Sequence, residues 1–489
     1  MNTPWNAGHL PGLDPGDVER HVLHFQAHGS ALAVAVPLLR PGQMQAVAAH
    51  VRQHARQTLQ AMPVSRIIDV IDGAVARLLD AGDPFRRELD ALLPIVTGYD
   101  AGMVRLGLDA YLQTFRAPQL HRFVAQDFAN PKVLDEFQPA MKGGAVRAFG
   151  PRLLAHGWAG NVPGLPLWSL ACGLLVKAGN VGKLPSAEPV FASVFARLLA
   201  EVHPPLADCL AVVWWKGGDP LLAEALYREA DTVLAYGGNT ALREVREQVP
   251  VTARFLGYGH KIGLALVGRA ALDAQRGPAT ARLAALDIAR YEQQGCYSPH
   301  VVYVEEGGAI DPRTFARYLA AELANLQHRH PRRDLPLDEA TGVAAWRQAA
   351  EWRGLGAEGH ELLGDAKAPW AVAFSASAQP LAPSAGHRHI QVCGVGALDD
   401  VLPLLAPHAA FLQTVGLATT PSELYRLAGL LGEVGVTRIA PIGSMTLPEA
   451  GWHHDGRFNL ADLVRMVEIE QRAERAADRL AAYAQEDGA

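Results

Sequence analysis

The sequence predicts an α/β fold in which helices cover a parallel sheet, preceded by a mainly helical N-terminal part. Three observations support this prediction. A chain of 489 residues is too long for one simple core, so we expect two domains or one large α/β domain with appendages. Residues 1 to about 150 look mainly helical. From about 150 to 300, short apolar runs alternate with helical segments, which is typical of crossover units on a parallel sheet.

The clearest helix of the N-terminal part is predicted over residues 66–79. Apolar residues recur there at helical spacing, and Asp80 and Gly82 close the run. We find no motif with a recognisable chemical role in residues 1–150, so we interpret this part as scaffold.

The region that follows alternates between strands and helices. We predict a strand at 210–215, a helix from Pro220 to about Glu229 and a second strand at 232–236. The turn at 237–240 then opens another helix. This order is that of a parallel sheet with helical crossovers.

The C-terminal third is less regular. A strand is expected at 389–392 and a helix at about 399–405, whereas 310–385 is interpreted as a helical and loop insertion on the second domain. A C-terminal helix is predicted from Asn459, with one apolar face that packs on its own domain or on a second subunit.

Composition excludes several classes of protein. The net charge of −6 and dispersed Lys and Arg residues argue against a nucleic-acid binder. The longest apolar stretch, 165–176, is too short to span a bilayer, and no signal-peptide pattern stands at the N-terminus, so we expect a cytoplasmic protein. The cysteines stand singly, without a CxxC pair or a histidine cluster at ligand spacing. We therefore expect neither disulfides nor a bound metal.

One cysteine stands in an unusual context. Cys296 follows Gly295 and precedes Pro299, directly before the apolar run 301–304. Glycine allows close backbone approach and proline interrupts regular hydrogen bonding, a context that suits a nucleophile presented to a pocket. Taken alone, the residue could equally be a buried cysteine that serves as a small hydrophobe.

Three glycine-rich stretches could bind a nucleotide. The stretch 354–359 matches the dinucleotide fingerprint, but it follows a helical run rather than a strand, and we reject it. Residues 393–396 follow a strand but lack the third glycine, as in an ordinary tight crossover. Gly237 and Gly238 form the better candidate, because they precede a helix N-terminus that can supply amide hydrogens to a pyrophosphate.

Three phrases in order give the chain a family resemblance. Ala159–Gly164, Gln293–His300 and Gly451–Gly456 resemble motifs of the aldehyde dehydrogenase superfamily, and most closely those of the acyl-CoA reductases typified by LuxC. The resemblance implies two three-layer αβα domains with a reaction site between them. We expect an NADP-binding domain at 1–257, a catalytic domain at 258–440, and a C-terminal segment and helix at 441–489 that packs on the core or on a partner subunit.

The resemblance also implies roles for single residues. Cys296 would be the nucleophile that forms an acyl thioester, in an electropositive site that favours the thiolate, and Asn161 would donate a hydrogen bond to the oxyanion. Lys183 would contact the adenosine ribose. Ser186 leaves room for a 2′-phosphate and so favours NADPH. A turn residue at Asn161 and a plain surface lysine at Lys183 are the alternatives.

One departure from the hydrolytic aldehyde dehydrogenases bears on the reaction. Their Glu-Leu-Gly-Gly-Lys phrase supplies the base that activates water, and the corresponding stretch here, 257–261, places Gly257 where that glutamate would stand. Without the base, a thioester should survive to meet a thiol or a hydride. Whether His260 or His300 has a catalytic role stays open. His453 and His454 could line the acyl entrance or lie in a solvent loop.

The resemblance thus implies NADPH-dependent reduction of a fatty acyl thioester to an aldehyde, with coenzyme A as substrate or product. The acyl group would come as acyl-CoA or from a partner protein such as an acyl-protein synthetase, and a homo-oligomer is expected. One alternative is a CoA-acylating or hydrolytic aldehyde dehydrogenase working toward oxidation. An alternative of another class is an acyl-carrier subunit, in which the nucleotide contacts at Lys183 and Gly237–Gly238 would be expected to be lost.

Overall fold

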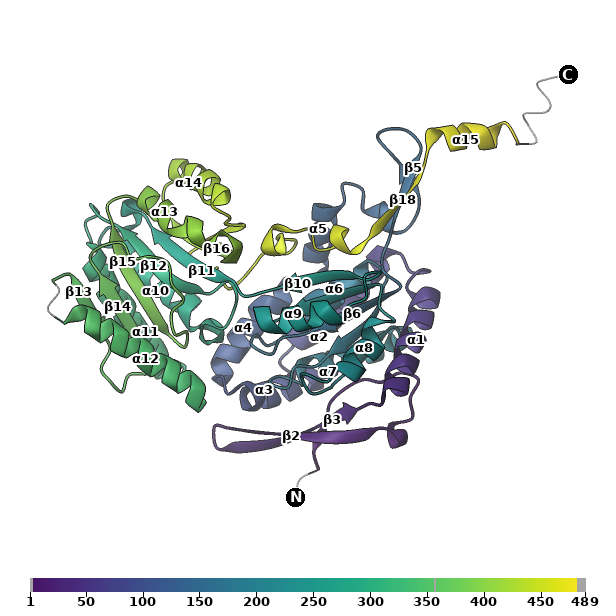
Figure 1. Ribbon diagram of the computed structural model, residues 1–489, viewed down its shortest axis with the longest axis horizontal. Coiled ribbons are helices and arrows are strands. Elements are labelled where there is room, and N and C mark those ends of the chain that lie inside the picture. The colour runs from purple at the N-terminus through teal and green to yellow at the C-terminus, as the bar shows by residue number, and fades with distance from the viewer. Residues whose placement is uncertain (1–2, 356–357, 482–489) are drawn as a thin grey trace.

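The chain forms two parallel sheets that lie side by side, as Figure 1 shows for the computed structural model, which describes residues 3–355 and 358–481. The first sheet has five strands in the order β10-β9-β6-β7-β8, all parallel. These strands are β6 (Leu153–Gly157), β7 (Gly179–Lys183), β8 (Leu210–Val213), β9 (Thr232–Tyr236) and β10 (Arg254–Tyr258). The predicted strands at 210–215 and 232–236 are confirmed as β8 and β9.

Helices cover both faces of the first sheet and make it a three-layer unit. The helices are α1 (Pro41–Thr58), α6 (Pro166–Leu175), α7 (Phe191–Val202), α8 (Pro220–Tyr227) and α9 (Asn239–Gln248). Alternate residues of the strands divide between two buried clusters. Leu154 and Val212 pack with α6 and α7, whereas Ala155 and Val213 pack with α1 and α8. The apolar stretch at 165–176, judged too short to span a bilayer, is a buried helix.

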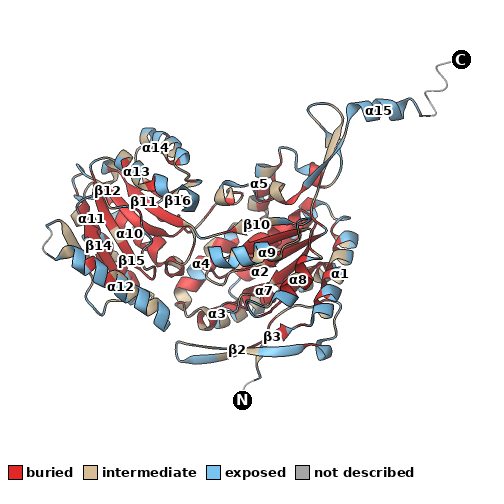
Figure 2. Cartoon of the chain, viewed as in Figure 1, coloured by how far each residue is buried: buried red, intermediate tan, exposed pale blue. Residues whose placement is uncertain are grey.

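The second sheet has seven strands in the order β13-β14-β15-β12-β11-β16-β17, and only β13 runs antiparallel to its neighbour. They are β11 (Ile262–Val267), β12 (Pro299–Glu305), β13 (His360–Leu363), β14 (Ala371–Ser375), β15 (His389–Val395), β16 (Leu412–Ala418) and β17 (Arg438–Pro441). One face packs on α10 (Arg276–Ala289) and α11 (Pro312–Arg329), and the other on α13 (Leu402–Leu405) and α14 (Pro421–Glu433). Figure 2 shows the buried strands between more exposed helices.

The insertion expected at 310–385 is partly wrong. It does contain two long helices, α11 and α12 (Leu337–Gly354), but β13 and β14 also lie within it and complete one edge of the second sheet. The helix α12 precedes the rejected fingerprint at 354–359, as expected, although part of that stretch lies outside the described residues.

The N-terminal part is mainly helical but holds a hairpin that the sequence analysis missed. Its helices are α2 (Val64–Leu79), α3 (Pro84–Thr97), α4 (Ala101–Gln113) and α5 (Ala117–Asp127). The hairpin joins β2 (Glu19–Ala27) to β3 (Ser30–Leu38), and β1 (Trp5–Asn6) pairs in parallel with β3. Its turn depends on His28 and Gly29, which both have positive φ.

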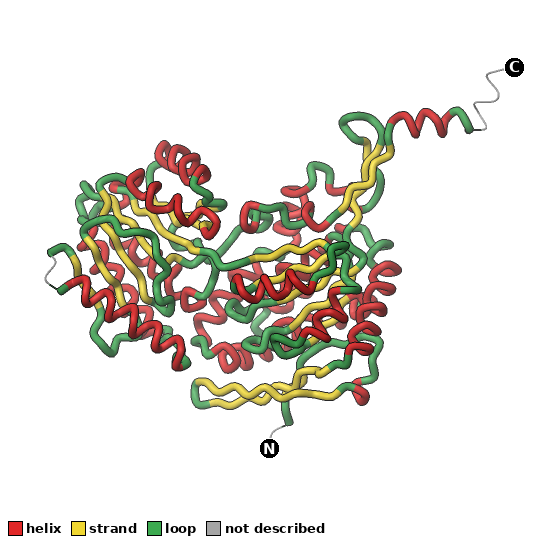
Figure 3. The backbone as a smooth tube through the Cα atoms, in the orientation of Figure 1, coloured by secondary structure: helices red, strands yellow, loops and turns green. Residues whose placement is uncertain are grey.

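The C-terminal helix predicted from Asn459 is wrong in its bounds. Residues 465–469 form a strand, β18 (Arg465–Ile469), which pairs with β5 (Ala145–Phe149), and β5 pairs with the short β4 (Gln138–Pro139). The strands β4, β5 and β18 form an arm that projects from the protein. The helix α15 (Gln471–Asp478) follows this arm, and its residues are exposed and do not pack on the core (Figures 1 and 3). Among the described residues, no helix combines the length and apolar character needed to cross a membrane.

Candidate active site

A cavity of about 540 Å³ opens where the two sheets meet, and both contribute to its walls. From the first sheet come the loop after β6 and the carboxyl ends of β9 and β10; from the second comes the turn before β12. Cys296, Asn161, Gly237 and Gly238 all line the cavity. Four of the six site residues that the sequence analysis proposed are thus brought together, whereas Lys183 and Ser186 lie outside the cavity wall.

The turn that carries Cys296 has an unusual backbone. Tyr291, Glu292 and Gln293 all have φ between 51° and 60°, in the left-handed region that residues other than glycine rarely adopt. Conformations of this kind cost about 1–3 kcal/mol each and are often found at functional sites. The positive φ of His387 and Arg388, in the neighbouring segment, adds to this cluster.

Buried polar contacts hold the turn in that conformation. The Glu292 carboxylate accepts two hydrogen bonds from the Arg388 guanidinium, at 2.8 and 3.1 Å, and both side chains are buried. The Gln293 amide donates to the carbonyl of Pro299 at 2.9 Å and accepts from the backbone N–H of His389 at 3.0 Å. The second sheet therefore fixes the position of the cysteine.

Gly295 is required because the Tyr297 side chain packs against it, and not because of its own backbone conformation. A Cβ placed there would lie 2.4 Å from Cε2 of the Tyr297 ring. The glycine thus lets that ring fold back under the turn, where Tyr297 packs with Val162 and Tyr291 beside Cys296. The close approach at this glycine is thus that of a side chain, whereas the sequence had led us to expect a close approach of backbone.

The Cys296 thiol contacts one polar side chain. Its Sγ lies 3.5 Å from Nε2 of Gln413, which comes from β16 and is buried. The same nitrogen donates to Oδ1 of Asp455 at 2.6 Å. Gln413 and Asp455 were both missed by the sequence analysis, because neither stands in a motif and each lies more than 100 residues from Cys296 in the chain.

The thiol is protonated at neutral pH in this structure. Burial is the main cause that raises the pKa of Cys296 to about 11. The Gln413 amide and the Arg438 charge act against this rise, and the Asp455 carboxylate adds to it. This differs from the electropositive, thiolate-favouring site that the resemblance implied. Because Cys296 keeps some accessible surface on the cavity wall, it can still meet a substrate there.

Asn161 joins the two halves of the cavity. Its Nδ2 donates to the carbonyl of Gln294 at 2.6 Å, and its own carbonyl accepts from the Tyr99 hydroxyl at 2.9 Å. The Asn161 Oδ1 is buried and has no hydrogen-bond partner among the residues that the structure describes. An amide fixed in this way, next to the cysteine turn, has one further N–H available for a bound carbonyl oxygen.

The residues expected to bind the cofactor lie at the carboxyl ends of the first sheet. The order of that sheet reverses between β6 and β9, and ligands bind at such switch points in open parallel sheets. No atom lies within 4 Å of a Cβ placed on Gly238, so packing does not demand this glycine, and a ligand can approach the backbone at the start of α9. These features fit a dinucleotide.

Lys183 and Ser186 lie further along the same edge. The Lys183 ammonium stands 5.2 Å from the centre of the Trp215 ring, and burial lowers its pKa. It forms no ion pair with any residue that the structure describes, which leaves it available to an oxygen of a ligand. Ser186 is exposed, and its hydroxyl accepts a hydrogen bond from Nε1 of Trp214 at 3.1 Å.

The structure places the four histidines singled out in the sequence and one more, His387. His260, His300, His387 and His454 line the cavity, whereas His453 does not. Burial lowers the pKa of His300, His387 and His454 to about 4 each, so these rings are neutral near pH 7 and are weak bases. His454 stacks on Tyr258 with ring centres 4.3 Å apart.

One carboxylate lines the cavity in the described part of the chain, and the sequence analysis missed it. Glu339, from α12, accepts two hydrogen bonds from Arg333 at 2.6 and 2.8 Å and lies 3.4 Å from Nε2 of His387. Gly257, by contrast, does not line the cavity, and a Cβ there would meet the Phe255 ring at 3.0 Å. Position 257 therefore contributes no group to the cavity wall.

Known structures share this fold. Aldehyde dehydrogenase 21 from Physcomitrella patens superposes with a TM-score of 0.71 at 14% identity, over 96% of this chain and 99% of that one. An NADP-dependent glyceraldehyde-3-phosphate dehydrogenase from Bacillus halodurans gives 0.69 at 14% identity, over 96% and 100%. The aldehyde dehydrogenase fold, with its two three-layer αβα domains, is confirmed.

Sequence relatives are more specific. The long-chain acyl-protein thioester reductase 2 of Photobacterium leiognathi is 27% identical over 72% of this chain and 71% of its own length. The long-chain acyl-protein thioester reductase of Aliivibrio fischeri is 26% identical over 79% and 77%. The family described as acyl-CoA reductase (LuxC) matches residues 59–466. The chain therefore belongs to the LuxC family of acyl-CoA reductases, which are aldehyde-forming oxidoreductases.

Proposed function

We propose that the protein reduces a long-chain acyl thioester to the aldehyde, with NADPH as reductant and an acyl-Cys296 thioester as intermediate. The observation that carries this proposal is the position of the Cys296 thiol on the cavity wall, which also holds the Asn161 amide fixed against the cysteine turn. The names of the relatives, long-chain acyl-protein thioester reductases, support the acyl class. Acyl-CoA and acyl-protein are both donors of the right chemistry.

In the proposed first step, Cys296 attacks the acyl carbonyl. The C–S bond to Cys296 forms, the bond to the donor thiol breaks, and the Cys296 proton is transferred to the departing donor thiolate. The free N–H of Asn161 and the backbone N–H of Cys296 stabilise the oxyanion, where each such donor is typically worth about 3 kcal/mol. The Gln413 amide stabilises the transient thiolate.

The second step reduces the acyl-enzyme. A bound nicotinamide would supply the hydride for this step. Cys296 would leave the thioester carbon as the thiolate, which frees the aldehyde. Gly237, Gly238, Lys183 and Ser186 would hold the dinucleotide at the carboxyl end of the first sheet. Asn161 serves this step as well, because negative charge again develops on the same oxygen.

The cavity wall suits an apolar chain. In addition to the reacting groups, the cavity is lined by large apolar and aromatic side chains from distant parts of the sequence. They include Tyr111, Val162, Leu165, Trp168 and Trp452. Burying each methylene of an acyl chain contributes about 0.8 kcal/mol, so longer chains should bind more tightly until the cavity is filled.

The direct test is an assay with NADPH and acyl-CoAs of graded length. We expect loss of nicotinamide absorbance matched by aldehyde formation, with kcat/KM rising with chain length. An acyl-carrier subunit would bind the acyl group without forming aldehyde. Formation of aldehyde therefore distinguishes a reductase from an acyl-carrier subunit. A degradative aldehyde dehydrogenase would instead favour aldehyde and the oxidised cofactor.

The cofactor residues give a separate prediction. Lys183→Ala should raise the KM for NADPH well beyond its effect on acylation of Cys296, because the ammonium contacts only the dinucleotide in this proposal. Ser186→Glu should shift preference toward NADH, since its carboxylate repels a 2′-phosphate. Steady-state kinetics with both cofactors measure these effects. Unchanged preference in both variants would show that the dinucleotide lies elsewhere.

Substitutions of Gln413 and Asp455 are predicted to change the pKa of the Cys296 thiol in opposite directions. Gln413 lowers the pKa of the Cys296 thiol and Asp455 raises it. Hydrogen bonds to charged groups contribute about 1.5–3 kcal/mol, so Gln413→Leu should raise that pKa by roughly one unit and slow alkylation by iodoacetamide at pH 8 about tenfold. Asp455→Asn should speed it.

The control for this pair is Gln379→Leu, which removes a glutamine that contacts Ser375 and Ser377 away from the cavity. It should leave the pH profile of alkylation unchanged. A general loss of structure would slow or speed both active-site variants alike. Equal shifts in the two variants would therefore contradict the assigned roles.

A further inference from the structure

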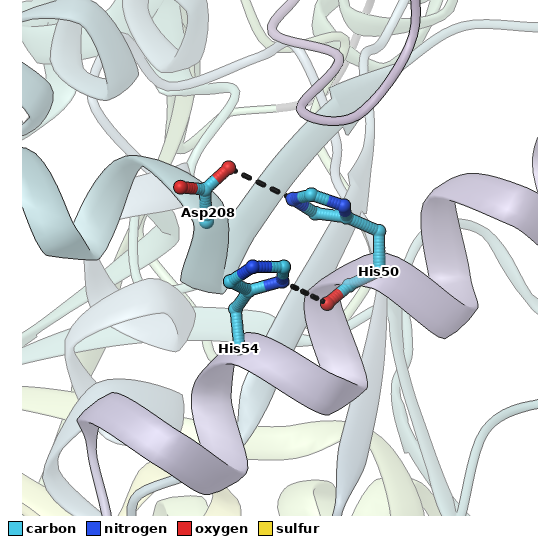
Figure 4. A group of neighbouring side chains, drawn as sticks. All are labelled: His50, His54 and Asp208. Atoms are coloured by element: carbon cyan, nitrogen blue, oxygen red, sulfur yellow. Dashed lines mark hydrogen bonds and ion pairs between the residues drawn. The ribbon is translucent and has the colours of Figure 1, made fainter.

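A cluster of potential metal ligands lies outside the active-site cavity, on the far side of the first sheet. His50 and His54 are four residues apart on α1, and Asp208 comes from the 3₁₀ turn Pro204–Cys209 that leads into β8. One ligand atom from each of the three lies within 4.8 Å of the others. Figure 4 shows both imidazole rings and the carboxylate gathered on one side of α1.

The tautomer of His54 favours metal binding. Its Nδ1 lies 2.9 Å from the backbone carbonyl of His50, and because a carbonyl can only accept, Nδ1 carries the proton. Nε2 is then left with a free lone pair. A histidine whose other ring nitrogen donates to a carbonyl is the usual arrangement around protein-bound metals.

His50 is oriented by packing on its other side. A Cβ on Gly12, which has φ +78°, would lie 2.5 Å from Nδ1 of His50, so the loop before β2 holds the ring in place. The opposite nitrogen, Nε2, lies 2.8 Å from Oδ1 of Asp208. The two imidazoles stack with ring centres 4.0 Å apart and planes inclined by 26°.

The charge and exposure of the cluster also suit a cation. Asp208 forms no ion pair with Arg or Lys in the part of the chain that the structure describes, and its one ionic contact is with His50. The His50 and Asp208 side chains are 25% and 44% exposed, so a hydrated ion can reach them. Two imidazoles and one carboxylate match the ligand sets of zinc sites that keep a fourth position for water.

We propose that His50, His54 and Asp208 form a Zn²⁺ site, with water as the fourth ligand. Zinc replaces the proton shared by His50 Nε2 and Asp208, and the three donors, now within 4.8 Å of one another, would close to typical Zn–N and Zn–O bonds of about 2.0–2.2 Å. This proposal departs from the expectation, drawn from the sequence, that the chain binds no metal. The spacing of two histidines by one helical turn was the signal available in the sequence.

Such a site would tie the N-terminal helix to the edge of the first sheet. α1 covers one face of this sheet, and the turn bearing Asp208 leads directly into its edge strand β8. A ligand that binds only the folded state stabilises it in proportion to the logarithm of its concentration. The zinc is therefore assigned to stability and not to the reaction at Cys296.

The test is titration of the chelator-treated full-length protein with Zn²⁺, by calorimetry and by competition with a chromophoric chelator. Because the Cys296 thiol and the cavity histidines can bind zinc themselves, the titration is repeated in Cys296→Ala. We expect one site per chain in both proteins, and a melting temperature that rises with free zinc. The absorption spectrum with Co²⁺ should show tetrahedral coordination by nitrogen and oxygen.

Variants of the ligands decide the assignment. His50→Ala, His54→Ala and Asp208→Asn should each weaken binding by at least about 10- to 100-fold and abolish the thermal shift, while reductase activity without zinc is retained. His121→Ala, at an exposed histidine of α5, is the matched control and should bind as the wild type does. Wild-type affinity in both histidine variants, or no zinc binding at micromolar free metal, would overturn the proposal.

Discussion

Incubation with a long-chain acyl-CoA, without a nicotinamide cofactor, is expected to acylate Cys296 and no other cysteine. Cys172, Cys209 and Cys393 are buried in the two domain cores at 2%, 0% and 0% exposure, and burial raises the pKa of each. Only Cys296 lines the cavity. Intact mass and peptide mapping would locate the acyl group.

Cys296→Ala should abolish this labelling and reduce reductase activity to background, because loss of a nucleophile removes the whole covalent route. Cys393→Ala is the matched control, since it removes a cysteine of the second sheet that is buried in its core. That variant should still be acylated. Labelling at Cys172, Cys209 or Cys393 in the wild type would contradict the assignment of the nucleophile.

Oxidation of a long-chain aldehyde with NADP⁺ is expected to depend on a thiol acceptor. Without coenzyme A little free acid should form, and adding coenzyme A should restore turnover as the thiol resolves the acyl-enzyme. A positioned general base is typically worth 10²- to 10⁴-fold, so the contrast should be of that order. Rates of acid and acyl-CoA formation measure it.

Glu339→Gln is the control for this prediction, because Glu339 is the carboxylate on the cavity wall among the described residues. Arg333 binds the Glu339 carboxylate with two hydrogen bonds, so we do not expect this carboxylate to activate a water molecule. Glu339→Gln should therefore leave the ratio of acid to acyl-CoA unchanged. Gly257→Glu should not create hydrolysis, since position 257 lies off the cavity wall. Rapid release of free acid by the wild type without a thiol would favour a hydrolytic aldehyde dehydrogenase. If Glu339→Gln then lost this acid release, Glu339 would be identified as the base.

The parts of the fold that were predicted correctly carry strong local signals. The strand β9 begins and ends at the residues predicted, because its apolar run is bounded by turn residues and buried on both faces. The helix α2 was found from the spacing of its buried residues. In both cases, burial in the folded protein follows the periodicity of the sequence.

The parts that were missed depend on distant pairing. Residues 465–469 look like a helix face locally, but β5, more than 300 residues earlier in the chain, pairs with them and makes them a strand. The strand β14 was taken for part of an insertion, although β15 pairs with it to extend the second sheet. Tertiary contacts of this kind override local propensity.

The residues of the candidate site also fall into those that the sequence identified and those that it did not. Cys296 and Asn161 stand in recognisable phrases, and the structure places both on the cavity wall. Gln413 and Glu339 reach that wall from separate elements, as single polar residues without a motif. The left-handed backbone at 291–293 is likewise fixed by the distant Arg388, so the strain before the cysteine could not be seen from local sequence.

The most direct test of the proposed function is a single turnover of the isolated acyl-enzyme. Protein acylated at Cys296 is separated from acyl donor and then mixed with NADPH in the absence of any thiol. The account predicts one equivalent of long-chain aldehyde per acyl-enzyme, one equivalent of NADPH consumed and a free Cys296. Release of fatty acid, or an acyl-enzyme that persists unchanged with NADPH, would contradict it.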